Sequence, residues 1–265
     1  MRVNSEGVPL FYDVRGEGPA LVLLHPFPLS HKYWEPLAAH LEDGRRLILP
    51  DLRGHGLSGT GSAPATMETL ANDILRVCEA AQVQRAVFFG CSIGCYVIWQ
   101  LWRMHPECFK GMILSSTRAE SDSEPARQQR LLAAEKALRD GPAEVVEAML
   151  PRLLGETTKR DNPIAVNALR TIMLRSSGEG IAAVQRGMAG RPDSTETLST
   201  ITVPTLVFGG EEDILCPIEG MEAMAGRIRY AEFHRISHAG HLASYENPDA
   251  VLRIVRPFLE NLGGC

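Results

Sequence analysis

Short apolar runs alternate along the chain with longer segments in which apolar residues recur every three or four positions. Most short runs are apolar throughout, which is typical of strands buried on both faces of a sheet. The longer segments have helical periodicity; in residues 67–81, Leu70, Ile74 and Val77 fall on one face. This alternation predicts βαβ units and a mostly parallel sheet. The expected strands are residues 20–25, 46–51, 86–90, 111–116, 205–210 and 231–237.

The two ends of the chain carry different patterns. Residues 7–19 alternate between apolar and polar positions and end in glycines, which predicts an antiparallel hairpin at the edge of the sheet. Residues 249–262 have a helical pattern, but Pro257 lies inside it. A proline inside a helix removes a backbone hydrogen bond, so we expect a kink or a break there.

One long region interrupts the alternation. Residues 118–200 contain helical patterns and no convincing strand, so we expect an all-helical insertion between two sheet strands. Ligands of α/β sheets bind beyond the carboxyl ends of the strands, where this insertion leaves and rejoins the sheet. We therefore expect a helical cap at 118–200 over a core domain formed by 1–117 and 201–265. The expected cap helices are 124–140, 142–154, 162–177 and 179–190.

Composition and charge narrow the class of protein. The 265 residues are 45% hydrophobic and 22% charged, which is ordinary for a globular protein. The formal net charge is -5, and no cluster of lysine and arginine dominates, so we expect no nucleic-acid partner. No apolar stretch approaches 18 residues and the N-terminus lacks an apolar signal core, which predicts a cytoplasmic protein without a membrane partner.

The six cysteines are scattered through the chain, and without an export signal we expect free thiols. Cys91 and Cys95 have no second cysteine or histidine pair near them in sequence, so we expect no metal site. There is no glycine-rich nucleotide loop, so we expect no cofactor. The other four cysteines are Cys78, Cys108, Cys216 and Cys265.

The sequence Gly90-Cys91-Ser92-Ile93-Gly94 follows a predicted strand and precedes a predicted helix. The pattern G-x-S-x-G alone is common and can occur by chance in a loop. In a strand–turn–helix setting it predicts a sharp turn with an exposed, strained serine. The helix N-terminus there favours developing negative charge, so Ser92 is a candidate nucleophile.

A serine hydroxyl needs a base to take its proton, and the base needs an orienting carboxylate. Asp213 and His241 are the best-placed residues, because each follows a predicted strand and the acid precedes the histidine. His238 competes for the base role, and an acidic pair, Glu120 and Asp122, competes for the acid role from an earlier loop.

Five motifs together resemble the α/β-hydrolase family, in its order and across nearly the whole chain. The resemblance implies an α/β-hydrolase fold with Ser92 as nucleophile, Asp213 as acid and His241 as base. It also implies an oxyanion hole formed by the backbone N–H groups of Phe27 and Ile93. The motifs are HPFPLSHKYW (25–34), DLRGHGLS (51–58), GCSIG (90–94), PTLVFGGEEDILCP (204–217) and SHAGHLASYENP (237–248).

The closest resemblance is to small capped esterases and 3-oxoadipate enol-lactonases. Two residues depart from the family pattern. Pro26 follows His25 where glycine is usual, and Cys95 stands where a second glycine often follows the serine motif. The oxyanion donor is the next residue, Phe27, so we expect the hole to survive.

The substrate-contacting residues are less specific. We take His25 and Trp34 from the first motif, and Met149 and Met173 from the cap, as candidates. For each of the cap residues taken singly, packing of the cap onto the body is the favoured role.

The resemblance implies a serine hydrolase that cleaves a small-molecule carboxylic ester or lactone through an acyl-enzyme, as a monomer or homodimer. Alternatives with the same triad are a perhydrolase or haloperoxidase-like enzyme, a hydroxynitrile lyase and a carbon–carbon bond hydrolase. A non-catalytic ligand-binding protein of the same fold is a further alternative. Dehalogenase and epoxide-hydrolase relatives carry aspartate at the nucleophile position, so Ser92 argues against both.

Overall fold

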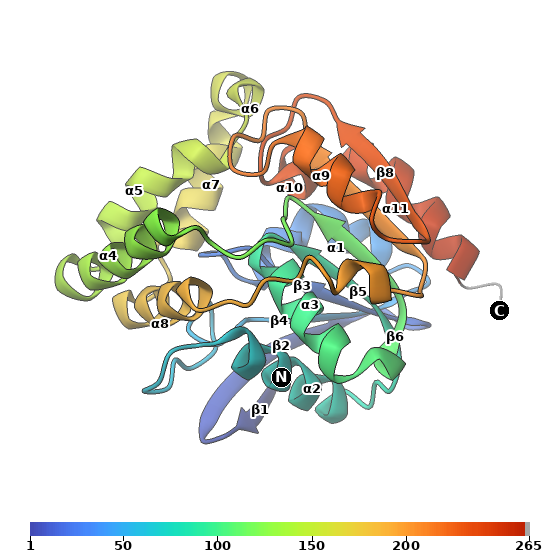
Figure 1. The fold of residues 1–265 in the computed structure, drawn as a ribbon, viewed down its shortest axis with the longest axis horizontal. Coiled ribbons are helices and arrows are strands. Elements are labelled where there is room, and N and C mark those ends of the chain that lie inside the picture. Colours follow the sequence, from blue (N-terminus) through green and yellow to red (C-terminus); the bar gives the residue numbers. More distant parts are fainter. Residues whose placement is uncertain (263–265) are drawn as a thin grey trace.

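The computed structural model describes residues 1–262, which form one eight-stranded sheet with helices on both faces (Figure 1). The strand order is β1-β2-β4-β3-β5-β6-β7-β8. Strands β3 to β8 run parallel, whereas β2 is antiparallel to both of its neighbours. The strands are β1 Arg2–Ser5, β2 Val8–Arg15, β3 Ala20–Leu24, β4 Arg46–Pro50, β5 Ala86–Cys91, β6 Phe109–Ser115, β7 Thr205–Gly210 and β8 Ala231–Ile236.

The central strands are apolar throughout because their alternate side chains enter two different cores. In β3, Leu21 and Leu23 pack into one core, and Val22 and Leu24 into the other. Successive side chains of a strand point to opposite faces, so a strand covered on both sides has no solvent-facing position. This double burial explains why the strands could be predicted from apolar runs alone.

Helices α1 and α11 contribute to one core, and α2, α3 and α9 to the other. α11 continues through Pro257 as a single helix, so the predicted break is absent. The bounds are α1 Glu35–Leu41, α2 Met67–Ala80, α3 Ile93–Met104, α9 Ile218–Ala225, α10 Ala243–Glu246 and α11 Pro248–Leu262, with short 3-10 turns at His31–Trp34, Pro106–Cys108 and Leu198–Thr200.

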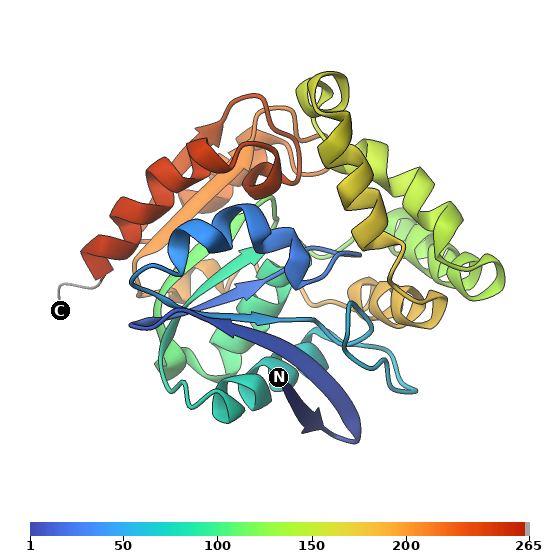
Figure 2. The same ribbon diagram turned by 180° about the vertical axis from the view of Figure 1, so that it is seen from behind.

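Five helices lie between β6 and β7 and stand to one side of the sheet (Figures 1 and 2). Four were expected, whereas the short α6 was not. Side chains of Ser123, Asn162 and Ser177 accept hydrogen bonds from the first turns of α4, α7 and α8, which fixes where those helices begin. The helices are α4 Glu124–Asp140, α5 Pro142–Leu153, α6 Glu156–Asp161, α7 Pro163–Met173 and α8 Gly178–Ala189.

The cap is tied to the body by backbone as well as side-chain contacts. The N–H of Ala65 donates to the carbonyl of Ala183 in α8 at 3.0 Å. The hydroxyl of Ser176 donates to the carbonyl of Pro28 at 3.1 Å. The fold class predicted from the sequence is confirmed, including the helical insertion.

The N-terminal edge differs in detail from the prediction. An antiparallel hairpin is present, but it pairs β1 with β2 and turns at Glu6 and Gly7. Residues 16–19, expected to belong to the hairpin, instead lead from β2 into β3. The glycines there close a loop rather than a hairpin turn.

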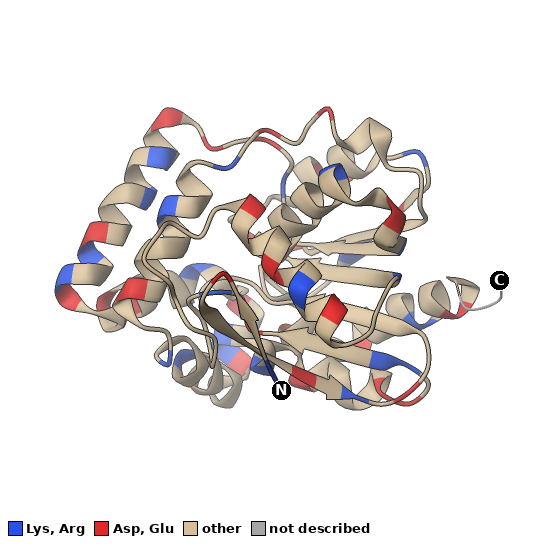
Figure 3. Ribbon diagram, turned by 90° about the horizontal axis from the view of Figure 1, so that it is seen from below, with Lys and Arg blue, Asp and Glu red and all other residues tan. Residues whose placement is uncertain are grey.

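Acidic and basic residues are interspersed along the ribbon (Figure 3). None of the helices in residues 1–262 is long and apolar enough to cross a membrane. The five cysteines in this range are free thiols, and Cys265 lies outside the described residues.

Candidate active site

Ser92 lies at a sharp turn between β5 and α3. Its backbone has φ 55° and ψ -115°, a strained conformation for a residue with a side chain. A Cβ on Gly94 would lie 2.3 Å from the carbonyl oxygen of Leu24, and one on Gly90 would lie 2.7 Å from the N atom of Cys95. The two glycines of the motif are therefore required for the close approach of the backbone around Ser92.

The turn lies where the order of the strands reverses. From β3 the chain moves to β4 on one side and then to β5 on the other. Leu24 at the end of β3 is paired with Gly90 near the end of β5, so residues 25–27 follow β3 beside Ser92. Ligand sites of α/β proteins lie at such a reversal, beyond the carboxyl ends of the strands.

Two backbone N–H groups in this region make no hydrogen bond to a protein acceptor within residues 1–262. Within residues 1–262, the N–H groups of Phe27 and Ile93 donate to no backbone or side-chain acceptor. Ile93 begins α3, so its N–H belongs to the unpaired first turn of that helix. These are the two groups that the sequence resemblance assigns to an oxyanion hole.

The loops after β7 and β8 bring Asp213 and His241 together. The Nδ1 atom of His241 lies 2.8 Å from Oδ2 of Asp213, and both side chains are buried. The other carboxylate oxygen of Asp213 accepts N–H groups of Leu215 at 2.8 Å and Cys216 at 3.0 Å. The carboxylate is therefore fixed on both sides.

The histidine loop also reaches the turn that carries Ser92. The thiol of Cys91, the residue before Ser92, lies 3.7 Å from the carbonyl oxygen of His241 and donates to it. The phenol of Tyr33 donates to the same sulfur at 3.4 Å. The fold thus gathers the neighbourhoods of Ser92, Asp213 and His241 from three separate loops.

The opposite charges of His241 and Asp213 shift the pKa of each residue. Burial lowers the pKa of His241, but the charge and hydrogen bond of Asp213 outweigh burial and hold that pKa well above the usual value of 6.5. Burial raises the pKa of Asp213, but the His241 charge and hydrogen bond and two backbone N–H groups bring it below its usual value. The arrangement thus favours an imidazolium beside a carboxylate.

The competing residues lie elsewhere. His238 is exposed, whereas the carboxylate of Asp122 pairs with Arg130 and, at 2.5 Å, with Arg191. Neither residue forms part of the hydrogen-bonded pair between the loops after β7 and β8.

A model of the α/β hydrolase fold family matches residues 19–248 of the chain. The chain belongs to the α/β-hydrolase family. A malate-bound thermophilic esterase from Thermogutta terrifontis is 37% identical in sequence, with a TM-score of 0.97 over 99% of both chains. An enol-lactonase from Burkholderia xenovorans is 26% identical, with a TM-score of 0.91 over 98% of this chain and 100% of that one.

A third relative of this hydrolase is the 3-oxoadipate enol-lactonase 1 of Acinetobacter baylyi. It is 26% identical over 264 residues, which cover 99% of this chain and 97% of the relative. The predicted resemblance to esterases and enol-lactonases is thus confirmed. At the level of enzyme class, the hydrolase is a carboxylic ester hydrolase.

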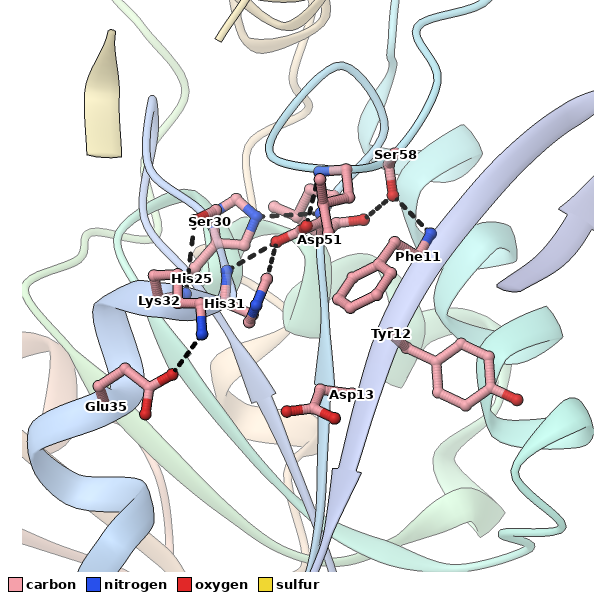
Figure 4. Close-up of polar contacts among 12 residues, drawn as sticks. Phe11, Tyr12, Asp13, His25, Ser30, His31, Lys32, Glu35, Asp51 and Ser58 are labelled. Carbon is pink, nitrogen blue, oxygen red and sulfur yellow. Dashed lines mark hydrogen bonds and ion pairs between the residues drawn. The ribbon is translucent and has the colours of Figure 1, made fainter. Parts of the chain in front are cut away.

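A buried polar network supports the loop that carries Phe27 in the hydrolase (Figure 4). Oδ1 of Asp51 accepts both the backbone N–H and the Nδ1–H of His31, at 2.7 and 2.8 Å. Oδ2 of Asp51 accepts the N–H of Leu57 at 2.8 Å, and Ser58 bridges the Asp51 carbonyl to strand β2. Sequence reasoning assigned no role to Asp51, although the motif DLRGHGLS contains it.

His25 joins this network as a neutral ring. Its Nε2 accepts the N–H of Leu52 at 2.9 Å, so the proton is on Nδ1, which donates to the carbonyl of Pro26 at 2.9 Å. Burial is the main cause that lowers the pKa of His25 to about 4. His25 thus links the loops after β3 and β4.

The candidate substrate contacts are mostly internal. His25, Trp34 and Met173 are fully buried, and Met149 is half-buried. The Trp34 ring lies 4.5 Å from that of Phe89, centre to centre. These placements favour a packing role for Trp34 and Met173, and leave Met149 as the cap candidate with accessible surface.

The two departures from the family pattern are accommodated. Pro26 accepts hydrogen bonds through its carbonyl, from His25 and from the N–H of Leu29. The Cys95 side chain is buried, and its thiol donates to the carbonyl of Ser115 at 3.6 Å. The larger residue at position 95 therefore still allows α3 to pack on the sheet.

The side chain of Cys216 is also buried beside Asp213 and His241. Within residues 1–262, the possible metal-binding atoms of Asp213, Cys216 and His241 lie within 4.8 Å of one another. Of these three side chains, Asp213 and His241 bond each other at 2.8 Å.

A surface pocket of about 640 Å³ lies away from this site, and Ser92, Asp213 and His241 are not among the residues that line it. It is lined by Arg85, Trp102, Arg103, Pro106, Glu107, Phe109, Thr200, Thr202 and Val203.

Proposed function

We propose that the hydrolase cleaves small carboxylic esters or lactones through an acyl-enzyme on Ser92. His241 acts as the base and Asp213 as the orienting acid. The observation that carries this proposal is the buried 2.8 Å hydrogen bond between His241 and Asp213. The loop of His241 also contacts Cys91, the residue before Ser92.

In the first half of the reaction, the Ser92 oxygen attacks the carbonyl carbon of the ester while His241 takes its proton. The carbonyl double bond opens, and its oxygen becomes an oxyanion in a tetrahedral intermediate. When the intermediate collapses, the bond to the alcohol oxygen breaks and His241 returns the proton to the leaving alcohol. In a lactone that alcohol stays attached to the acyl group.

In the second half, water takes the place of Ser92 as the attacking group. His241 removes a proton from water, the hydroxide adds to the acyl carbon, and the bond to the Ser92 oxygen breaks. The proton returns to Ser92 and the carboxylic acid leaves. Asp213 accepts the Nδ1–H of His241 throughout, which selects the tautomer whose Nε2 is free for proton transfer.

The oxyanion of both intermediates would be stabilised by the N–H groups of Phe27 and Ile93. Their lack of protein acceptors within residues 1–262 supports this role. One such donor can be worth about 3 kcal/mol of barrier. The strained backbone of Ser92 and its position at the start of α3 support this assignment.

The test is hydrolysis of p-nitrophenyl esters and small lactones by the wild type and by Ser92→Ala. We expect the substitution to lower kcat by several powers of ten with no change in folding. Ser237→Ala is the matched control, because that serine is exposed. Near-normal turnover by pure Ser92→Ala would refute the nucleophile assignment.

A serine-directed fluorophosphonate probe separates an enzyme from a ligand-binding protein of the same fold. The native wild type should be labelled on Ser92, and heat-denatured protein should not. Absence of labelling together with absence of turnover on every ester and lactone would contradict the proposed activity.

A further inference from the structure

Glu246, at the end of α10, holds both neighbours of His241 in the backbone. Its Oε1 accepts the N–H of Gly240 at 2.9 Å and that of Leu242 at 3.0 Å. A carboxylate that accepts backbone N–H groups makes charge-assisted hydrogen bonds, which are stronger than those between neutral groups. The His241 backbone is therefore held on each side by one oxygen atom.

The second oxygen of the same carboxylate reaches the cap. Oε2 of Glu246 accepts the N–H of Gly155 at 2.7 Å, and Gly155 is the residue before α6. The N–H of His241 itself donates to the carbonyl of Leu153, at the end of α5, at 3.0 Å. In Figures 1 and 2, α6 lies beside the loops that follow β7 and β8.

The approach of the two segments depends on their glycines. A Cβ on Gly240 would lie 2.3 Å from the N atom of Gly155, and one on Gly155 would lie 2.8 Å from the N atom of Gly240. Any side chain at either position would push the cap segment away from the histidine loop. The contact is thus made by two bare backbones joined through one carboxylate.

A second carboxylate ties the same cap segment to the other loop of the pair. Glu212 accepts the backbone N–H of Thr157 at 2.8 Å and its hydroxyl at 2.5 Å. Glu212 precedes Asp213 in sequence but does not bond the neighbours of His241. It therefore offers a natural control for loss of cap attachment alone.

We propose that Glu246 is a positioning residue, which couples the cap to the placement of His241 through these three backbone hydrogen bonds. The inference rests on the proposed function, because it concerns the geometry of the proposed base. Proton transfer is sensitive to placement, and a displacement of about 1 Å can lower the rate by about 100-fold. Loss of the Glu246 carboxylate therefore releases the backbone on both sides of His241 together with the cap segment.

The experiment compares Glu246→Ala, Glu246→Gln and Glu212→Gln by kcat and KM on a p-nitrophenyl ester. A second readout is the downfield proton resonance of the His241 Nδ1–H, which reports the bond to Asp213 without turnover. Glu246→Ala removes both acceptor oxygens and with them all three hydrogen bonds, and we expect kcat to fall by about 10- to 100-fold with a shifted or broadened resonance. KM should change much less than kcat.

Glu246→Gln retains one acceptor oxygen, which can serve the neighbours of His241 or Gly155 but not both. We expect it to recover part of the lost kcat. Glu212→Gln should leave the resonance in place and cost much less in kcat. Glu211→Gln, at an exposed position, is the neutral control.

Wild-type kcat and resonance in folded Glu246→Ala would overturn the proposal, and so would equal losses in Glu246→Ala and Glu212→Gln. If Glu246→Ala does not fold, Glu246→Gln decides, since wild-type values there would also overturn it. Because the resonance needs no substrate, a failure of this inference is distinguishable from an absence of hydrolase activity.

Discussion

Nδ1 of His241 lies 2.8 Å from Oδ2 of Asp213, although the two residues are 28 positions apart in sequence. Each side chain comes from the loop after one of two neighbouring parallel strands, β7 and β8. Asp213 is fixed by two backbone N–H groups, and the backbone around His241 is fixed by Leu153 of the cap and by Glu246.

Asp213→Asn keeps the shape of the acid and removes its charge. We expect kcat to fall by about three to four powers of ten, because the amide neither selects the histidine tautomer nor stabilises the imidazolium. Thermal unfolding should show little loss of stability. The assay is kcat on a p-nitrophenyl ester.

The matched comparison is Asp122→Asn on the earlier loop. Asp122 pairs with Arg130 and Arg191, so its loss should act on stability and leave the chemistry nearly unchanged. A crippling effect of Asp122→Asn on kcat, with a mild one for Asp213→Asn, would move the acid to that earlier loop.

The pH dependence of activity should report His241. The proposed base works only when unprotonated, so we expect activity to rise as the pH passes upward through the pKa of His241. Because Asp213 holds that pKa well above 6.5, the rise should be centred above 6.5 in the wild type. In Asp213→Asn burial remains and the attraction is lost, so the residual activity should rise at a lower pH. An unchanged midpoint in the variant would show that another group titrates.

His241→Ala and His238→Ala distinguish the two histidines of the last loop. His241 is buried against Asp213, whereas His238 is exposed. We expect His241→Ala to abolish turnover together with its pH dependence and His238→Ala to leave both in place, as measured by kcat across a pH series. The reverse pattern would assign the base to His238.

Asp51→Asn tests the network beneath the proposed oxyanion loop. The amide offers one acceptor oxygen in place of two, so an N–H group of His31 or Leu57 loses its buried partner. Leaving a buried donor without its acceptor typically costs about 1–3 kcal/mol in the free energy of unfolding.

Urea titration should therefore show a large drop for Asp51→Asn. Asp13→Asn is the control, since Asp13 pairs with Arg15 at the surface and should cost about 1 kcal/mol or less. Equal stabilities of the two variants would remove the proposed importance of the Asp51 network.

Substitutions of Met149 and Met173 test two different roles of cap residues, substrate choice and packing. Met173 is fully buried, so Met173→Ala should lower the free energy of unfolding by about 2–5 kcal/mol. Met149 is half-buried, so Met149→Ala should cost less and change the preference between short and long acyl chains. An equal response of all chain lengths to Met149→Ala would exclude this residue from substrate selection.

The strands, the turn at Ser92 and the main candidate site residues could be predicted from local sequence patterns. Strands such as β7 were predictable because both of their faces are covered, so every position is buried and most are apolar. Gly90 and Gly94 mark the turn at Ser92 because only glycine tolerates the backbone contacts there. Chain order and the strand ends singled out Asp213 and His241, since their loops follow adjacent strands of one sheet.

How the loops meet depends on the three-dimensional fold. His241 and His238 both follow β8 with similar sequence surroundings, but only His241 points to Asp213. The role of Asp51, the neutral state of His25 and the contact of Glu246 with Gly155 all depend on residues distant in sequence. Local periodicity reports which face of an element is buried, whereas hydrogen bonds between loops depend on where the folded sheet and cap place them.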